Sequence, residues 1–178
     1  KVIATEPNHA DSHFGLAASL ERIGQHAASL TSLERVIALD PKNIDAREAA
    51  VGLALALDDS AKSVAQAAEL VKMKQDSPTA LKALASSKLS AGDFAAAAEL
   101  CGRIVKSAPR EFEAWYNFGF ANQQLNKLDD AQKAYEEALR LRGGSADAAG
   151  NLGRVLQQLG KIQEAFAAFE KVYQAEPE

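Results

Sequence analysis

The sequence has little that would cross-link a protein or interrupt its helices: 178 residues include one cysteine, five prolines and 6% aromatic residues. The lone Cys101 excludes an internal disulfide and leaves the redox compartment undecided. No apolar run approaches the ~18 residues that a membrane-spanning helix needs. The net charge of −4 provides no basic excess to neutralise phosphates. We therefore expect no membrane span in this chain and no nucleic acid as its partner.

The residues that are abundant favour close-packed helices. Hydrophobic residues make up 47% of the chain and charged residues 25%, which is typical of a globular protein. Alanine accounts for about a fifth of the sequence. Its small side chain lets helices approach closely, and its helix propensity is the highest of all residues.

The prolines reveal an internal repeat. Pro7, Pro41, Pro109 and Pro177 are separated by 34, 68 and 68 residues, which are multiples of one period. Cutting the chain at this period gives five units: 10–43, 44–77, 78–111, 112–145 and 146–178. Residues 1–9 read like the end of a preceding unit. We expect a single array over residues 1–178.

Each unit carries residues at helical spacing. Trp115, Phe118 and Gly119 share one face of a helix because they lie three and four residues apart, and residues 131–138 repeat the pattern on a second helix. The spacing W-x2-F-G, then A-x3-Y-x2-A, with a helix-ending proline, resembles the tetratricopeptide repeat over essentially the whole chain. The resemblance implies an all-α fold, a right-handed superhelical α-solenoid of helix-turn-helix repeats.

Two recurrent positions have clear packing roles. The eighth residue of a unit is small, which lets the two helices of a hairpin approach; examples are Ala17, Ala85, Gly119 and Gly153. A mid-helix glycine costs about 1 kcal/mol relative to alanine, so we attribute it to packing. Cys101 aligns with Tyr135 and Phe169, so we expect it to be a buried small hydrophobe.

The turns within the units also follow a pattern. Gly24, Gly92 and Gly160 fall where the first helix must end, a position suited to a left-handed residue. We expect Asp93 and Asp129, which precede the second helices, to cap them.

The unit at 44–77 departs most from the pattern. Arg47 replaces a large apolar residue, Val51 a small one, and Asp58 stands where glycine is common. We expect this hairpin to be the loosest or most irregular, with a shifted turn around residues 58–60.

The resemblance also implies a function, because repeats of this family bind protein segments along a concave wall formed by the first helices. Asn117 and Asn151 occupy the position where family members hold the backbone of an extended peptide, and one amide offers both a donor and an acceptor. The alternative is that these amides are merely solvated. The candidate peptide-binding residues are Lys82, Glu113, Tyr116, Asn117, Phe120, Gln124, Asp147, Asn151, Arg154 and Gln158.

Charge suggests the kind of partner. The expected lining is mostly acidic, which favours a neutral or basic peptide, although charged helix faces are often only solvated. The family's clamp for a carboxylate terminus is not expected, because only Lys82 and Asn117 match its pattern and Asp147 would repel a carboxylate.

No constellation of residues indicates catalysis, a cofactor or a metal site. His9 and His13 are four residues apart, but His9 is expected to precede the helix and His13 to take a packing position. Gly143 and Gly144 follow no strand, so they do not read as a phosphate-binding loop. We interpret the chain as a non-catalytic binding scaffold. The alternative is the regulatory or substrate-recruiting part of a larger enzyme, for instance a glycosyl- or sulfotransferase.

The last unit suggests a further partner, a second protein chain. Repeat arrays usually end in a polar capping helix, and none follows Pro177 in this sequence. We expect the exposed face formed by Phe166, Phe169, Val172 and Tyr173 to pack on another chain, as in self-association, or to be covered by further sequence.

Overall fold

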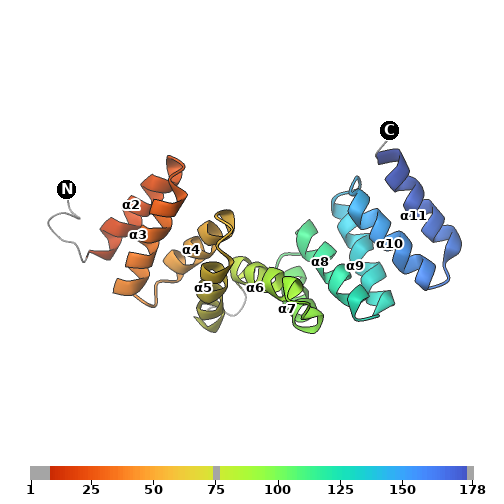
Figure 1. Ribbon diagram of the computed structural model, residues 1–178, viewed down its shortest axis with the longest axis horizontal. Helices are drawn as coiled ribbons and strands as arrows, with labels where there is room; N and C mark the ends of the chain where they lie inside the picture. The colour runs from red at the N-terminus through yellow and green to blue at the C-terminus, as the bar shows by residue number, and fades with distance from the viewer. Residues whose placement is uncertain (1–8, 74–76, 176–178) are drawn as a thin grey trace. The chain divides into compact units, whose positions relative to one another are not determined.

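The computed structural model describes residues 9–73 and 77–175, with side chains up to Glu170. These residues form ten α-helices and no β-strand (Figure 1). The first helices of the hairpins are α2 (Ala10–Arg22), α4 (Ile44–Ala56), α6 (Pro78–Ser90), α8 (Phe112–Gln124) and α10 (Ala146–Gln158). The second helices are α3 (His26–Leu39), α5 (Ser60–Met73), α7 (Phe94–Ser107), α9 (Leu128–Leu141) and α11 (Ile162–Ala175). Within each set, every helix begins 34 residues after the previous one.

The contacts divide the chain into two units, residues 1–87 and 88–178, with the boundary inside α6. In the first unit, α2, α3 and α4 share one core whose largest members are Leu30, Leu33 and Val36, and α5 packs on α6 through Leu70 and neighbouring alanines. In the second unit, α9, α10 and α11 share a core that contains the fully buried Tyr135. The single array expected over 1–178 stays a prediction.

The small residues at the eighth position let the helices approach as expected. A Cβ atom added to Gly119 would lie 2.9 Å from the ring of Tyr135, and one added to Gly153 would lie 2.6 Å from the ring of Phe169. Ala17 and Ala85 are each only 2% exposed. An aromatic ring therefore rests directly on the backbone of the first helix in the last two hairpins.

The turns inside all five hairpins have the same conformation. A left-handed residue follows each first helix, and these residues are Gly24, Asp58, Gly92, Asn126 and Gly160, with φ between 55° and 76°. The next residue donates its N–H to a carbonyl five residues earlier, as in the bond from Asp59 N to Ala54 O at 2.9 Å. The shifted turn expected around residues 58–60 is thus wrong, because aspartate tolerates the left-handed region better than most residues.

Capping of the second helices is partly as expected. Asp93 caps α7 by accepting the N–H of Ala96 at 3.3 Å, and the Lys88 ammonium together with this bond lowers the pKa of the Asp93 carboxyl. Asp129 does not cap α9, because that helix already begins at Leu128 after Lys127. Asp129 lies instead in the first turn, where a negative charge complements the helix dipole.

Arg47 is accommodated in the second hairpin by hydrogen bonds. Its side chain is 8% exposed, and its guanidinium donates to Pro41 O at 3.0 Å and to Gln66 Oε1 at 2.6 Å. Trp115, at the same position two units later, donates its indole N–H to Pro109 O at 2.9 Å. Arginine and tryptophan thus bond to the carbonyl of the equivalent proline.

Candidate peptide-binding surface

Two first helices of the second unit place most of the candidate residues. Glu113, Tyr116, Asn117, Phe120 and Gln124 follow one face of α8, since they recur at steps of three and four residues. Asp147, Asn151, Arg154 and Gln158 have the same spacing on α10. We call these nine residues the α8–α10 surface. The remaining candidate, Lys82, lies half-buried on α6 in the first unit.

A hydrogen bond joins the two helices of this surface. Asn151 donates its side-chain N–H to the hydroxyl of Tyr116, with 3.1 Å between Nδ2 and the phenolic oxygen. The amide oxygen of Asn151 accepts a hydrogen bond from the Arg154 guanidinium. Asn151 is only 5% exposed. Its amide therefore already has a partner at each end, and it positions Tyr116 and Arg154 instead of presenting a free amide.

Aromatic packing holds the two candidate rings. The ring of Tyr116 lies 6.0 Å from that of Phe112 and 5.9 Å from that of Tyr135. The ring of Phe120 meets Phe94 edge-on at 5.9 Å. Tyr116 and Phe120 are half-buried against the core of α9, α10 and α11. They are rigid anchors with part of each ring open to a ligand, a combination typical of interface residues.

Three amides of the surface have no partner. Asn117 is half-buried and Gln124 and Gln158 are exposed, and none of their side chains makes a hydrogen bond within residues 9–73 and 77–170. Gln123, one residue before Gln124, instead accepts the hydroxyl of the buried Tyr135 at 2.9 Å. The free amides can therefore donate to and accept from a peptide backbone.

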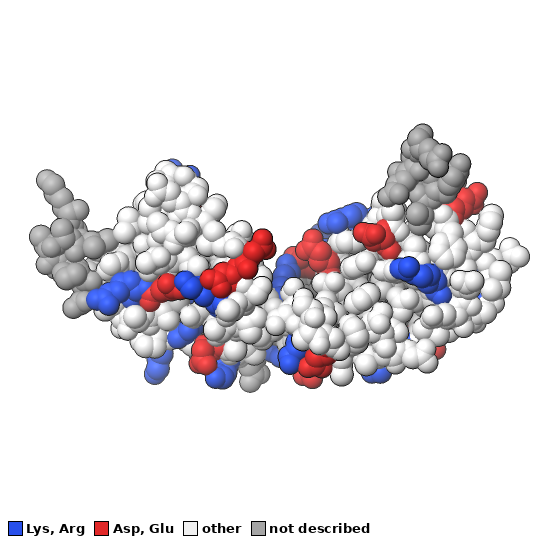
Figure 2. All heavy atoms as spheres, in the orientation of Figure 1, with Lys and Arg blue, Asp and Glu red and all other residues white. Residues whose placement is uncertain are grey.

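The charges on the α8–α10 surface are mixed. Glu113 and Asp147 are exposed, and so is Arg154. Glu113 lies 4.0 Å from Arg142, whose guanidinium also stacks 3.9 Å above the ring of Phe112. On the face of the molecule that Figure 2 shows, positive and negative side chains are interspersed. The acidic lining expected from the sequence stays a prediction.

Residues beyond the predicted set border this surface. Phe94, Phe112 and Arg142 contact its aromatic rings or charges, and the sequence interpretation did not include them. Phe112 precedes Tyr116 by one helical turn, so helical spacing alone could have indicated it. The sequence offers no comparable signal for Phe94 and Arg142, which reach the surface from α7 and from the end of α9.

The lone thiol of the chain and the hydroxyl-bearing ring of Tyr135 are buried. Cys101 is 1% exposed, as expected, and burial raises the pKa of its thiol to about 11. Burial also raises the pKa of Tyr135. The described residues contain no group of three His, Cys, Asp or Glu side chains placed to hold a metal ion. Among the helices of residues 9–73 and 77–175, none is long and apolar enough to span a membrane.

Comparison with known proteins identifies the repeats. Three family models described as tetratricopeptide repeat match residues 10–43, 82–121 and 110–176. No curated protein matches the sequence.

Solved structures share the fold. The crystal structure of YrrB, described as a TPR protein with an unusual peptide-binding site, covers 99% of this chain and 91% of its own at 16% identity and a TM-score of 0.84. A MamA crystal structure covers 94% and 91% at 18% identity and a TM-score of 0.80. MamA from Desulfovibrio magneticus RS-1 covers 93% and 94% at 17% identity and a TM-score of 0.78.

The identities are low, so these structures show the fold alone. The fold agrees with the helix pairs, their 34-residue spacing and the family models. The resemblance seen in the sequence is confirmed: the chain belongs to the tetratricopeptide repeat family, and it folds as an all-α solenoid of helical repeats.

Proposed function

We propose that this chain is a non-catalytic scaffold that binds an extended segment of another protein on the α8–α10 surface. The observation that carries the proposal is the pairing, on one face of α8, of held aromatic rings with free amides. Tyr116 and Phe120 offer apolar contact, and Asn117 and Gln124 offer backbone hydrogen bonds. YrrB, which shares the fold and is described as having a peptide-binding site, supports the idea that such an array can carry one.

The proposed roles differ from residue to residue. Asn117, Gln124 and Gln158 hold the peptide backbone, while Asn151 keeps Tyr116 and Arg154 in place. The carboxylates of Glu113 and Asp147 favour a neutral or basic segment over an acidic one. The positive charge of Arg154 on the same surface weakens this preference. Lys82 lies in the first unit, and its binding role stays a prediction. A recruiting role within a larger enzyme would use the same surface, and no contact in the described residues favours it.

The test begins with a random peptide library selected against the full chain, followed by fluorescence anisotropy on the strongest peptide. We expect the triple variant Asn117→Ala/Gln124→Ala/Gln158→Ala to bind that peptide roughly tenfold or more weakly, since each lost hydrogen bond removes about 0.5–1.5 kcal/mol. The matched control Lys133→Ala/Gln163→Ala changes exposed residues of the same unit outside the surface, and it should bind like the wild type.

Two results would count against the proposal. Equal affinity of the triple variant and the wild type would show that the peptide binds elsewhere. Enrichment of acidic peptides would overturn the charge preference while leaving the surface in place. Tyr116→Phe separates the roles further, because it removes the partner of Asn151 without removing the ring.

A further inference from the structure

Two charged side chains of the α8–α10 surface have no oppositely charged partner among the residues that the structure describes. Asp147 is in the first turn of α10, and Arg154 lies about two turns further along the same helix. Both side chains are exposed. Glu113, in contrast, lies 4.0 Å from Arg142. The surface therefore presents one uncompensated negative charge and one uncompensated positive charge.

The positive charge is held in place by a neutral group. The Arg154 guanidinium donates a hydrogen bond to the amide oxygen of Asn151, and the same amide donates to the Tyr116 hydroxyl. Because an amide carries no net charge, it orients the guanidinium without cancelling its charge. Burial raises the pKa of the Tyr135 hydroxyl, and Arg154 is close enough to oppose part of this rise. These contacts place the guanidinium on the side of α10 that faces α8 and α9.

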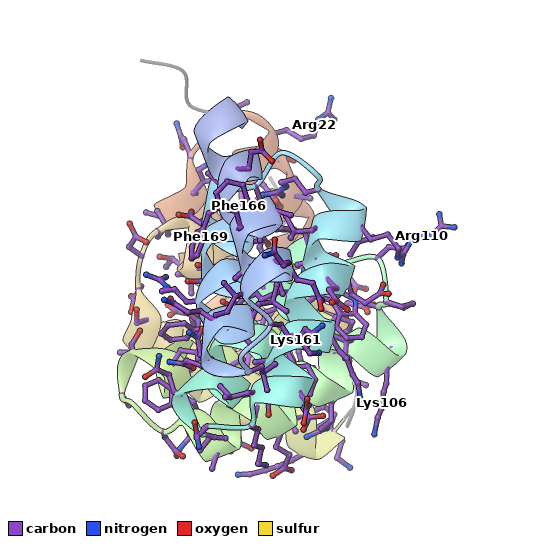
Figure 3. All side chains as sticks on the ribbon, turned by 90° about the vertical axis from the view of Figure 1, so that its right-hand side faces the viewer. Arg22, Lys106, Arg110, Lys161, Phe166 and Phe169 are labelled. Atoms are coloured by element: carbon purple, nitrogen blue, oxygen red, sulfur yellow. The ribbon has the colours of Figure 1, made fainter. Side chains whose placement is uncertain are left out.

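Other cations of the second unit are placed differently. Arg140 on α9 pairs with a glutamate one turn earlier at 2.8 Å. Lys161, at the turn before α11, donates to Gln132 Oε1 on α9 at 2.8 Å. Figure 3 shows the side chain of Arg110 extending away from the helices. Arg154 is therefore the oriented cation that the α8–α10 surface offers to a ligand.

The two groups bonded to Asn151 have hydrogens left to donate. The Tyr116 hydroxyl accepts from Asn151, so its own hydrogen remains for a ligand. A guanidinium has five N–H donors and no acceptor, and only one bond of Arg154 is made within residues 9–73 and 77–170. The hydroxyl and the guanidinium are neighbours because one amide bonds both. A carboxylate, with two acceptor oxygens and a negative charge, matches this pair.

The spacing of the two charges limits the ligand further. Asp147 and Arg154 are seven residues apart on α10, and the guanidinium reaches back by one turn to Asn151. The two charges are therefore separated by roughly 5–10 Å, a distance that an extended peptide covers in two or three residues.

We propose that the bound segment carries an acidic residue, whose carboxylate binds Arg154 and the Tyr116 hydroxyl, and a basic residue two or three positions away that faces Asp147. This inference rests on the peptide-binding function proposed above, and it specifies the ligand as an extended segment with paired charges. Arg154 is the specificity residue, and Asn151 is a positioning residue that acts through it. Such complementarity fixes the register of a bound peptide.

The test uses the strongest peptide selected from the random library against the full chain. The selected peptides should share an acidic and a basic residue at this spacing. Replacing the acidic residue by its amide should weaken binding to the wild type roughly tenfold in fluorescence anisotropy, because a charged hydrogen bond is lost. The same replacement should not change binding to Arg154→Gln, since the two changes remove the same interaction.

Asn151→Asp tests the positioning role. Aspartate has the shape of asparagine, but its negative charge neutralises the guanidinium, and an ionised carboxylate cannot donate to Tyr116. This variant should bind the acidic and the amide peptide equally. A merely structural role of Asn151 would lower both affinities and leave their ratio unchanged. Tyr116→Phe is a second variant with the same readout, and it should discriminate between the two peptides less than the wild type does.

A further arm identifies the source of the carboxylate. The selected peptide is also made with an amidated C-terminus, which should leave its affinity unchanged. Loss of binding on amidation, without an effect of the side-chain replacement, would show that a chain terminus is recognised and would overturn the inference.

Failure of this inference can be told apart from failure of the proposed function. If the wild type binds the acidic and the amide peptide equally, while Asn117→Ala/Gln124→Ala/Gln158→Ala still binds more weakly, the site stands and the role of Arg154 is refuted. Selected peptides without an acidic residue would refute it too. If the triple variant binds like the wild type, the peptide binds elsewhere and both proposals fail.

Controls keep the affinities comparable. Arg140→Gln removes an exposed arginine of the same unit outside the α8–α10 surface, and it should bind like the wild type. Sedimentation velocity at the working concentration shows whether the variants share one oligomeric state. Self-association through the last hairpin stays a prediction, because Val172 and Tyr173 lie outside the residues whose side chains are described.

Discussion

At the residue scale, two hairpins carry a buried serine at the same position, and only one of the two hydroxyl groups has a hydrogen-bond partner. The fourth residue of α9, Ala131, packs fully buried, and the equivalent residues in α3 and α5 are Ser29 and Ser63. Ser29 donates its hydroxyl to Ala17 O at 2.8 Å. Ser63 Oγ is buried without a hydrogen-bond partner in the described part of the chain. A buried polar group without a partner costs about 1–3 kcal/mol.

The pair gives a matched stability prediction. Ser63→Ala removes an unpaired hydroxyl and should raise the free energy of unfolding by about 1 kcal/mol, while Ser29→Ala removes a bonded one and should not raise it. Both variants gain the same helix propensity, so the difference between them isolates the hydroxyl. Urea titration measures both values. A Ser63→Ala variant that is less stable than Ser29→Ala would show that Ser63 has a partner in solution.

At the candidate site, the sequence predicted which residues share a surface but not which of their side chains are free to bind a ligand. Helical spacing indicated that Tyr116 and Asn151 belong to one surface, but it could not show that Asn151 is buried with both ends of its amide bonded. That outcome depends on the side-chain directions of two residues 35 positions apart, on two different helices. Asp129 was misplaced for a simpler reason, because a small shift of a helix boundary changes which side chain is the cap.

At the element scale, the distance between paired helices depends on a ring lying on a glycine. Gly119 lies under Tyr135, whose ring is fully buried and whose hydroxyl is bonded to Gln123. Gly153 lies under Phe169, whose ring is 39% exposed. A methyl group would be closer to the ring at Gly153 than at Gly119, but only the ring of Phe169 has open space to move into.

We therefore predict that the cost of an added methyl group depends more on whether the facing ring can move than on its distance from the glycine. Gly119→Ala should lower the free energy of unfolding by roughly 1–3 kcal/mol, the usual cost of overpacking. Gly153→Ala should be close to neutral, because Phe169 can rotate outward and alanine adds about 1 kcal/mol of helix propensity over glycine. Thermal unfolding followed by circular dichroism compares the two. A larger loss for Gly153→Ala would mean that the Phe169 ring is held as firmly as that of Tyr135.

The elements themselves were largely predictable. The period, the small eighth residue and the left-handed glycines at 24, 92 and 160 are local features that the structure repeats. Asp58 and Asn126 escaped prediction because neither residue requires the left-handed region. They adopt it because the helices on either side of the turn are already fixed by packing.

At the scale of the whole molecule, buried ionisable groups link stability to pH. The Cys101 thiol has a pKa of about 11 in the folded chain and 9.0 as a free side chain. Between these values the unfolded thiol ionises and the folded thiol does not, so rising pH favours unfolding. The contribution of the neutral thiol is fully present below pH 9 and is lost as the pH approaches 11.

The prediction compares the wild type with Cys101→Ala. Between pH 9 and pH 11 the free energy of unfolding of the wild type should fall by about 2 kcal/mol more than that of the variant. All other ionisable groups are common to the two proteins, so the comparison removes their effect. Denaturant titrations at several pH values measure it. Parallel pH profiles for the two proteins would show that the thiol is open to solvent.

The indole of the fourth hairpin has a practical consequence for optical work on this protein. Trp115 is the sole tryptophan in the chain, and all three tyrosines come after it. Absorbance at 280 nm and intrinsic fluorescence therefore originate entirely in residues 115–173. Trp115 also lies on α8, directly before Tyr116 in the sequence and edge-on to the ring of Phe118. The protein thus contains its own emission probe for ligand binding, and the first 114 residues contribute no background signal.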